Sequence, residues 1–422
     1  MNITFTDGVL FSSYFILLFL AIFWLLVFIS SENQPFKKRK LAKHPLFTAI
    51  VPARNEQSTI QATLQSLIDL DYPPEKIEII VSINGSSDNT LAVVEQFIAS
   101  YPQRNIAIIN HSAANKAGAM NRALSLALGE FFACLDADSF IHSNALQEIL
   151  PYFEGDSSLA AVCPLMKVKQ PKNILQKIQW YEYTVNMFYK FLNSKLDAVH
   201  VTPGPFSVYK TAVIKSLGGY DEQTITEDLE IAIRLQKHHY RIIQTFDAIV
   251  ETSAPGTWKA LFKQRVRWYK GSVDNSLRYK KLIFNRKYGD FGIIRMPTII
   301  LSGIIAIILL VTFLREIILN LFQWLASIKA INFDYLTVFR AYSFQINLLS
   351  LPIFKIIIAL TLIGLGFVVM VYSYKLVKED IRNHGKTLLS LITYLSIYSL
   401  FITLVWVYIA FLFITGKKNR WS

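Results

Sequence analysis

Four long apolar runs restrict what this 422-residue chain can fold into. They occupy residues 9–29, 296–314, 353–374 and 388–415. Each run is close to the roughly 20 residues that an α-helix needs to cross a bilayer. Residues 37–287 have the mixed composition of a globular domain, although 53% of the whole chain is hydrophobic and only 17% is charged. We therefore expect one water-facing domain between membrane helices.

The first apolar run predicts a retained membrane anchor. It is too long for a signal-peptide core and lacks a small-residue cleavage site. The basic cluster at residues 37–43 places the following domain in the cytosol by the positive-inside rule, so we expect an integral protein of the plasma (inner) membrane. The expected division is an N-terminal transmembrane anchor at residues 1–36, a cytosolic domain at 37–255, interfacial amphipathic helices at 256–292, and about three transmembrane helices at 293–422.

This topology contains one conflict. With the N-terminus outside and four crossings, the basic residues 416–422 would also lie outside, against the positive-inside preference. Either the final apolar run is not one simple span, or residues 316–331 form a re-entrant or extra element.

The net charge of +13 does not indicate nucleic-acid binding, because the basic excess lies at membrane borders. Residues 259–287 hold ten Lys or Arg and a single Asp, directly before an apolar run. Such a cluster suits anionic lipid headgroups or a diphosphate. The two cysteines, Cys134 and Cys163, lie in apolar strand-like stretches, which indicates a reducing compartment and no disulfide framework.

Strands and helices alternate through the first half of the globular domain. Short apolar runs at residues 47–52, 77–83, 106–110 and 131–135 predict strands, and residues 58–70, 88–100 and 116–128 predict helices between them. This alternation is typical of a mostly parallel sheet with right-handed crossovers, as in Rossmann-like α/β domains.

Polar residues follow each of these strands. They are Pro52, Arg54 and Glu56 after the first strand, Asn84 and Asp88 after the second, Lys116 after the third, and Asp136 and Asp138 after the fourth. The carboxyl ends of parallel strands share one sheet edge, where nucleotides bind in open α/β sheets. Two carboxylates one residue apart at that edge can hold a divalent cation that in turn holds phosphate oxygens.

Each of these signals also has a purely structural explanation. Asn84-Gly85 is a turn signal, Asp88 can cap a helix, and the Asp-Ala-Asp triplet can be a solvated turn. The convergence of four polar loops on one edge favours the nucleotide pocket. A Gly/Pro turn within residues 201–210 is expected to bring backbone close to something bulky.

Two further stretches carry candidate chemistry. Acidic residues at 227 and 228 begin a predicted helix, which suits the helix dipole and also places Asp228 as a general base facing the metal site. Residues 256–272 form a basic, aromatic, amphipathic helix expected to lie at the membrane interface, with Trp258, Leu261 and Phe262 in the boundary. Its Gln264, Arg267 and Trp268 can point into the pocket while the other face lies on the membrane.

Together these motifs resemble the family 2 glycosyltransferases, which are inverting enzymes with a GT-A fold. The ordered set is the loop from Pro52 to Glu56, Asp136-Ala137-Asp138, Thr226-Glu227-Asp228 and Gln264-Arg265-Val266-Arg267-Trp268. The pattern looks like that of the membrane-embedded processive synthases of cellulose, chitin, hyaluronan and poly-N-acetylglucosamine. By motif, the resemblance covers residues 47–272.

The resemblance implies a role for each candidate residue. The residues implied in donor binding are Pro52, Arg54, Glu56, Asn84, Asp88, Lys116, Asp136 and Arg267. Asp138 with Asp136 is implied in binding Mg²⁺ or Mn²⁺, and Gln264 with Trp268 in binding the acceptor. Catalysis is implied for Asp228 with Glu227. In this scheme Asp228 deprotonates the acceptor hydroxyl and Arg267 steadies the departing diphosphate. Many family members have an acid where Asn84 stands, which leaves the nucleobase open although UDP is expected.

Three functions follow from this reading. The first is a processive polymerase that builds, and also translocates, a β-linked polysaccharide from UDP-GlcNAc or another UDP-hexose. The second is a non-processive transferase that adds one sugar to a lipid or lipid-linked acceptor. The third, a receptor or scaffold with a degenerate nucleotide fold, is disfavoured because Asp136, Asp138, Asp228, Arg267 and Trp268 are all present. The expected partners are the nucleotide-sugar donor, a growing glycan or lipid acceptor and membrane lipids, with room for accessory export subunits and no nucleic acid.

Overall fold

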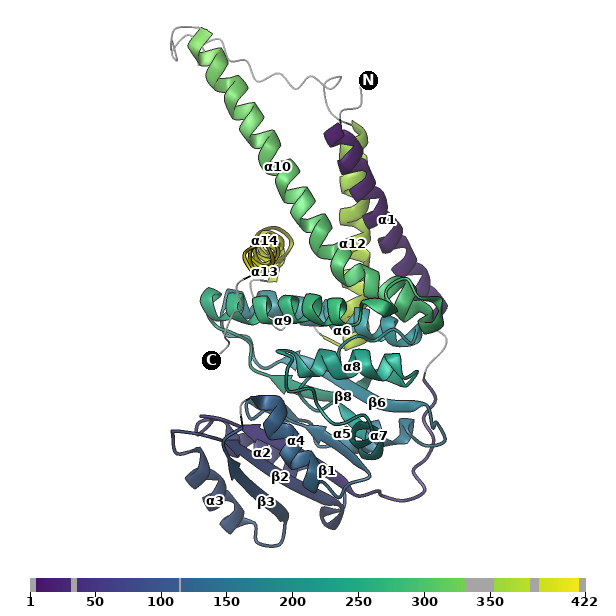
Figure 1. The fold of residues 1–422 in the computed structure, drawn as a ribbon, viewed down its shortest axis with the longest axis vertical. Helices are drawn as coiled ribbons and strands as arrows, with labels where there is room; N and C mark the ends of the chain where they lie inside the picture. The colour runs from purple at the N-terminus through teal and green to yellow at the C-terminus, as the bar shows by residue number, and fades with distance from the viewer. Residues whose placement is uncertain (1–4, 32–35, 114, 331–352, 380–386, 417–422) are drawn as a thin grey trace. The chain divides into compact units, whose positions relative to one another are not determined.

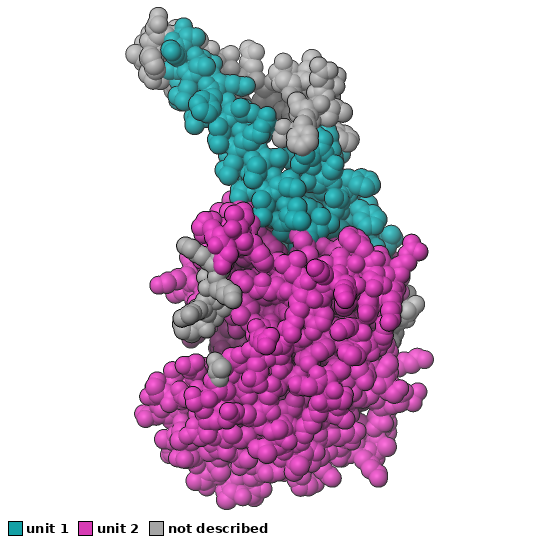
Figure 2. All heavy atoms as spheres, viewed as in Figure 1, with its two compact units in different colours: residues 1–26, 301–371 teal, residues 27–300, 372–422 magenta. Residues whose placement is uncertain are grey.

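The computed structural model describes residues 5–31, 36–113, 115–330, 353–379 and 387–416. By packing, the chain divides into two compact units (Figure 2). The first unit is Met1–Leu26 with Leu301–Val371, and the second is Val27–Ile300 with Tyr372–Ser422. The domain boundaries expected at residues 36, 255 and 292 stay predictions.

The first unit consists of long apolar helices. It contains most of α1 (Phe5–Ser31), α10 (Met296–Ala330) and α12 (Ile353–Val377). Large apolar side chains on these helices are exposed, for example Phe15 at 71% and Phe322 at 66%. Water-soluble proteins bury most side chains of this kind, so their exposure on these helices is typical of a surface that faces lipid.

Four helices in the described chain are long and apolar enough to cross a membrane. They are Asp7–Ser31, Phe291–Ala330, Ile356–Val377 and Leu391–Thr415. The last belongs to the second unit and consists of α13 (Thr387–Thr393), a π-helical turn at Tyr394–Tyr398 and α14 (Ser399–Thr415). The final apolar run is thus interrupted by an irregular turn.

The re-entrant element considered for residues 316–331 is not what the structure shows. Helix α10 continues without a break through Ala330, and Ile331 lies outside the described residues. With 35 residues α10 is about 52 Å long, which exceeds the roughly 30 Å of a hydrocarbon core. The basic residues 417–422, on which the topology conflict partly rests, also lie outside the described part.

A mixed sheet forms the centre of the second unit. Its described strands are β1 (Phe47–Ala53), β2 (Ile77–Asn84), β3 (Asn105–His111), β4 (Phe131–Cys134), β5 (Ser139–Ile141), β6 (Leu159–Val168), β7 (Val208–Lys210) and β8 (Arg241–Thr252), in the order β3-β2-β1-β4-β7-β6-β8-β5. β1 to β4 are parallel, as are β6 and β8, whereas β7 and β5 pair antiparallel with their neighbours. The mostly parallel α/β sheet is confirmed. β6 and β7 agree with a strand expected at residues 160–169 and with one expected after the Gly/Pro turn of residues 201–210, whereas β5 and β8 were not predicted.

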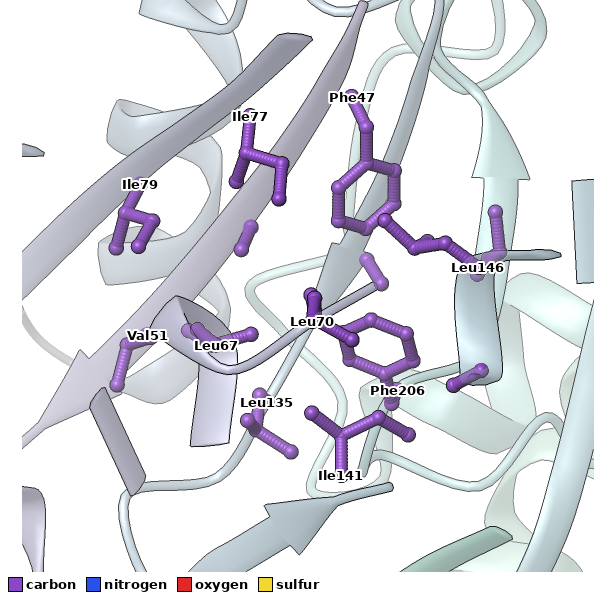
Figure 3. Packing of buried hydrophobic residues seen from close by; sticks show 14 of the residues in the cluster. Phe47, Val51, Leu67, Leu70, Ile77, Ile79, Leu135, Ile141, Leu146 and Phe206 are labelled. Atoms are coloured by element: carbon purple, nitrogen blue, oxygen red, sulfur yellow. The ribbon is translucent and has the colours of Figure 1, made fainter. Parts of the chain in front are cut away.

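Helices cover both faces of this sheet (Figure 1). They are α2 (Ile60–Ile68), α3 (Thr90–Ser100), α4 (Lys116–Leu126), α5 (Ala145–Ile149), α6 (Ile174–Lys195), α7 (Thr211–Ser216) and α8 (Glu227–Lys237), whereas α9 (Trp258–Arg278) contacts α8 and α14. Successive strand residues point to opposite faces, so Phe47, Ala49 and Val51 join one apolar cluster and Ile50 joins the other. Figure 3 shows the first cluster, in which Leu67 and Leu146 pack on the same face as Phe47.

The strand register determines where the polar loops emerge. Ile50 of β1 is level with Ile80 of β2 and with Cys134 of β4. The loops after β1, β2, β3 and β4 therefore leave the sheet at one edge, as the sequence predicted. Phe206 closes over the end of β4, because its backbone N–H donates to the carbonyl oxygen of Cys134 at 2.6 Å.

Helix α9 packs between α8 and the last apolar helix α14, and Figure 1 shows α14 end-on. The rings of Phe262 and Tyr408 lie 5.4 Å apart, and those of Tyr269 and Trp406 lie 5.0 Å apart. Leu261, expected at the membrane boundary, is instead fully buried in a cluster that contains Tyr398. Part of the apolar face of α9 is therefore covered by the chain's own last helix.

Candidate active site

The loops after β1 and β2 are joined by hydrogen bonds. The side-chain oxygen of Asn55 accepts from the backbone N–H of Ser87 at 2.8 Å, and the Asp88 carboxylate accepts from the backbone N–H of Gln57 at 3.2 Å. Asp88 also accepts from the hydroxyl and the N–H of Thr90, and these bonds lower the pKa of the Asp88 carboxyl. Asp88 is not the N-cap residue of α3, which is Asn89, but its carboxylate fixes the first residue of that helix and the neighbouring loop.

Three predicted donor residues lie at the end of β1 and on the loop after it: Pro52 belongs to the strand, and Arg54 and Glu56 belong to the loop. Arg54 is exposed, whereas Pro52 and Glu56 are half-buried. The Glu56 carboxylate accepts from the Thr59 hydroxyl at 2.8 Å, and its backbone N–H donates to Thr90 at 2.8 Å. The loop is therefore held in place while the Arg54 side chain stays available to a ligand.

Asn84 is engaged with the backbone. It is buried, its side-chain oxygen accepts from the N–H of Ala113 at 2.7 Å, and its amide group donates to the carbonyl of Asn115 at 3.4 Å. These bonds fix the segment between β3 and α4. Asn84 thus supports the site by orienting the start of α4.

Lys116 connects two parts of the site. Its ammonium group pairs with Asp136 and lies 3.5 Å from a carboxylate oxygen of Glu227. Burial alone would lower the pKa of Lys116, but the two carboxylates outweigh it and the pKa is raised. The predicted Gly/Pro turn lies against this pair, since a Cβ at Gly204 would stand 3.4 Å from an Asp136 oxygen.

Asp138 has the environment of a cation ligand. Burial, together with the carboxylates of Asp136 and Glu56, raises the pKa of Asp138 to about 6. Among the described residues no group of three His, Cys, Asp or Glu is close enough to form a complete metal site. Carboxylates that repel one another at a strand end fit a hard cation that takes its remaining ligands from phosphate oxygens and water.

Asp228 lies in the first turn of α8 and is held from both sides. Its backbone carbonyl accepts from the N–H and the hydroxyl of Thr202 at 3.2 and 2.9 Å, and its carboxylate accepts from the N–H of Leu229 at 2.9 Å. Burial and the Glu227 carboxylate raise the pKa of Asp228 to about 6, while Lys116 and Arg267 oppose the shift. Such a carboxylate is ionised at neutral pH and basic enough to accept a proton.

Thr226 joins the start of α8 to α9. Thr226 occupies the N-cap position, but its hydroxyl accepts from the amide of Asn275 at 3.1 Å instead of a helix N–H. A Cβ at Gly271 would collide with the Thr226 side chain. Helices α8 and α9 therefore approach each other closely beside Asp228.

The residues of the predicted motif on α9 face two different surroundings. Arg267 lies near enough to Asp228 and Lys116 to alter the pKa of both groups. Gln264 and Trp268 instead surround Arg265: the Gln264 side-chain oxygen accepts from its guanidinium group, and the Trp268 ring lies 4.2 Å beneath it. The Trp268 ring also lies 6.4 Å from that of Tyr183.

Sequence reasoning missed the roles of Thr202 and Arg265. Thr202 gave no signal beyond its place in the Gly/Pro turn. Arg265 is fully buried and follows Leu261 by four residues, so both lie on one helix face. A single arginine on an apolar helix face, with Glu182 in the aromatic run of α6, was the available signal.

Comparison with known proteins finds relatives of the region that holds the candidate site. The family model described as glycosyltransferase like family 2 matches residues 44–271, which hold every predicted site residue. The chain is 31% identical over 271 residues to a poly-beta-1,6-N-acetyl-D-glucosamine synthase of Staphylococcus epidermidis, covering 62% of this chain and 65% of the relative. It is 27% identical over 247 residues to a beta-monoglucosyldiacylglycerol synthase of Synechocystis, covering 58% of this chain and 52% of the relative. The match thus spans less than two thirds of either relative.

A solved structure supports the fold. A mannosyltransferase of Pyrobaculum calidifontis, in complex with GDP-Man and Mn²⁺, superimposes with a TM-score of 0.53 at 23% identity, covering 64% of this chain and 72% of the other. This likeness concerns the fold alone and agrees with a GT-A arrangement of the sheet. Since the family model covers more than half of the chain and all of its candidate site, the chain belongs to the glycosyltransferase-like family 2.

Proposed function

We propose that this protein is a membrane-bound inverting hexosyltransferase that uses a UDP-sugar, with UDP-GlcNAc preferred, to build and translocate a β-linked polysaccharide. The observation that carries the proposal is the grouping of Asp228, Glu227, Lys116 and Arg267 beside the Asp136 carboxylate. The similarity to the staphylococcal synthase supports the choice of sugar.

The proposed chemistry is a direct displacement at the anomeric carbon. As the bond to the diphosphate breaks, negative charge grows on the leaving group and positive charge on the sugar ring. In the proposed reaction Lys116 and Arg267 stabilise the leaving diphosphate, and Asp228 takes the proton of the attacking hydroxyl. Because one base acts and no covalent intermediate forms, the anomeric configuration inverts.

The donor side is proposed to follow the sheet edge. Pro52, Arg54, Glu56 and Asp88 would line the nucleotide, and Asn84 would support them through its backbone bonds. Asp138 with Asp136 would hold Mg²⁺ or Mn²⁺, which supplies positive charge for the phosphates when bound. Gln264 and Trp268 would contact the acceptor sugar.

The catalytic unit is proposed to lie in the cytosol, since the basic residues 37–43 follow α1 directly. Nucleotide sugars would then reach the sheet edge from the cytosol. The growing glycan and membrane lipids are the proposed partners, with room for accessory export subunits.

A second candidate function is the addition of one sugar to a lipid acceptor. The similarity to the Synechocystis glucolipid synthase favours it, and the same catalytic residues would serve. The two functions differ in product size and not in the chemistry of transfer.

The test is transfer by the purified protein in lipid vesicles. Radiolabelled UDP-GlcNAc and UDP-glucose are offered separately with Mg²⁺, Mn²⁺ or a chelator, and the product is sized and digested with a matching glycosidase. Label in a high-molecular-weight polymer supports the synthase. Label confined to a single-sugar glycolipid supports the second function, and absence of transfer from any UDP-sugar contradicts both.

A further inference from the structure

Arg265 forms a buried polar centre next to the acceptor motif. Its guanidinium group donates to Glu182 of α6 through two nitrogens, one of them to Oε1 at 3.1 Å. The arginine is fully buried and the side chain of Glu182 is 8% exposed. A buried ion pair costs desolvation, so replacing both partners by apolar side chains often leaves stability unchanged or improved. Stability alone therefore does not explain this pair.

The same guanidinium group contacts both proposed acceptor residues. Its Nη1 donates to the side-chain oxygen of Gln264, and its plane lies over the Trp268 ring at 4.2 Å. Because the side-chain oxygen of Gln264 faces the guanidinium group, its amide NH₂ group faces away from Arg265 and can donate a hydrogen bond to a ligand. The cation over the indole fixes the ring face.

A third contact leads to the last apolar helix. Nε of Arg265 also donates to the hydroxyl of Tyr398 at 3.1 Å, and Tyr398 ends the π-helical turn before α14. The Tyr398 ring stacks on Tyr394 at 5.7 Å, and Tyr394 in turn stacks on Tyr181 of α6 at 5.9 Å. π-Helical turns within helices are frequent at functional sites.

We propose that Arg265 is a positioning residue for the acceptor, which orients Gln264 and Trp268 and links them to the last apolar helix through Tyr398. The inference rests on the proposed function. Among the contacts described above, the proposed acceptor subsite is connected to the last apolar helix, whereas the proposed donor subsite is not. A change at Tyr398 then alters acceptor affinity and leaves donor affinity unchanged.

The decisive variant is the double substitution Arg265→Met with Glu182→Met, measured in the full-length protein in lipid vesicles. The double substitution removes both charges and therefore leaves no unpaired charge in the interior. The variant is expected to fold, with an unchanged melting temperature and an unchanged elution volume. The KM for the acceptor, either an N-acetylglucosamine oligosaccharide or dioleoylglycerol according to the transfer assay, rises about tenfold or more because the motif side chains lose their orientation. The Kd for UDP stays within about twofold, and Arg265→Lys recovers only part of the loss because lysine lacks the planar fork.

Tyr398→Phe provides a milder variant that keeps the ring packing. Loss of one hydrogen bond is expected to raise the acceptor KM about threefold and to leave UDP binding unchanged. Tyr408→Phe is the matched control, because its ring also packs on α9 but lies outside the Arg265 contacts.

Each outcome decides the proposal. A folded double variant with a normal acceptor KM would overturn the positioning role, and so would an equal effect of Tyr398→Phe and Tyr408→Phe. If the double variant does not fold, Tyr398→Phe decides. Absence of transfer by the unsubstituted protein overturns the proposed function itself, and the inference with it.

Discussion

The proposed donor edge and the proposed acceptor side of this site are built in different ways. At the donor edge, bonds between the β1 and β2 loops join residues about 30 apart in sequence, such as Asn55 and Ser87. On the acceptor side, Arg265 reaches partners 83 and 133 residues away. The donor edge therefore follows from local sequence order, whereas the acceptor side requires α6, α9 and the last helix to be assembled first.

The largest expected effect tests whether catalysis belongs to the junction of the two regions. Asp228→Asn removes the proposed base but keeps the size and the backbone bonds of the residue. We expect the transfer rate to fall about a thousandfold or more, with the Kd for the UDP-sugar nearly unchanged. Single-turnover transfer and equilibrium donor binding measure the two quantities. A variant with normal turnover would eliminate Asp228 as the base.

Asp138→Asn tests the donor edge alone. The substitution removes a carboxylate from the proposed cation site, so the Mn²⁺ concentration for half-maximal transfer should rise and the rate at fixed metal should fall about a hundredfold. The acceptor KM should not change. A metal titration of transfer checks this, with Asp274→Asn, an exposed carboxylate on α9 paired with Lys270, as the control. An unaltered metal requirement would remove Asp138 from the cation site.

The pH dependence tests the junction from its electrostatics. Because the pKa of Asp228 is raised to about 6, the base becomes protonated below that pH and the turnover number should fall about tenfold by pH 5. The sign for stability is opposite: the folded state holds this proton more tightly than the unfolded state, so ionisation between pH 4 and 6 lowers the stability. Turnover from pH 5 to 8 and melting temperature from pH 4 to 8 check the two expectations. A turnover number that stays constant down to pH 5 would contradict the assignment.

The smallest expected effect concerns the acceptor side. Gly271→Ala forces a methyl group into the Thr226 side chain, and we expect a loss of about 1–3 kcal/mol in the free energy of unfolding. Gly364→Ala on α12 is the control, because a Cβ there meets nothing within 4 Å and alanine favours the helix. Thermal unfolding in detergent measures both variants. Equal melting temperatures of the two variants would show that α8 and α9 can move apart to accommodate the methyl group without a loss of stability.

The same contrast explains what the sequence could predict. The strands β1, β2, β3 and β4 were predictable because each is a short apolar run bounded by turn residues. β8 was missed because Arg241, Gln244 and Asp247 interrupt its apolar pattern, and β5 because it has only three residues. The order of the loops at the sheet edge followed from the parallel strands.

Contacts between distant segments were beyond sequence reasoning. The apolar helix face around Arg265 indicates that its charge needs a buried partner, but it does not indicate which of the chain's acidic residues that partner is, and nothing near Asn84 indicates that its amide holds the start of α4. In both cases the partner is chosen by the packing of whole elements. A residue that is polar by type can then serve the backbone or another side chain instead of a ligand.

The placement of Lys116 has a consequence for the basicity of Asp228. This cation is shared between Asp136 at the donor edge and Glu227 beside the base, and its charge lowers the pKa of Asp228. A diphosphate that engages Lys116 would neutralise part of this charge and leave Asp228 more basic. Donor binding would thereby make the proposed base more basic just where the acceptor hydroxyl must be activated, and the pH profile of turnover would report a higher pKa for this group with donor bound than without it.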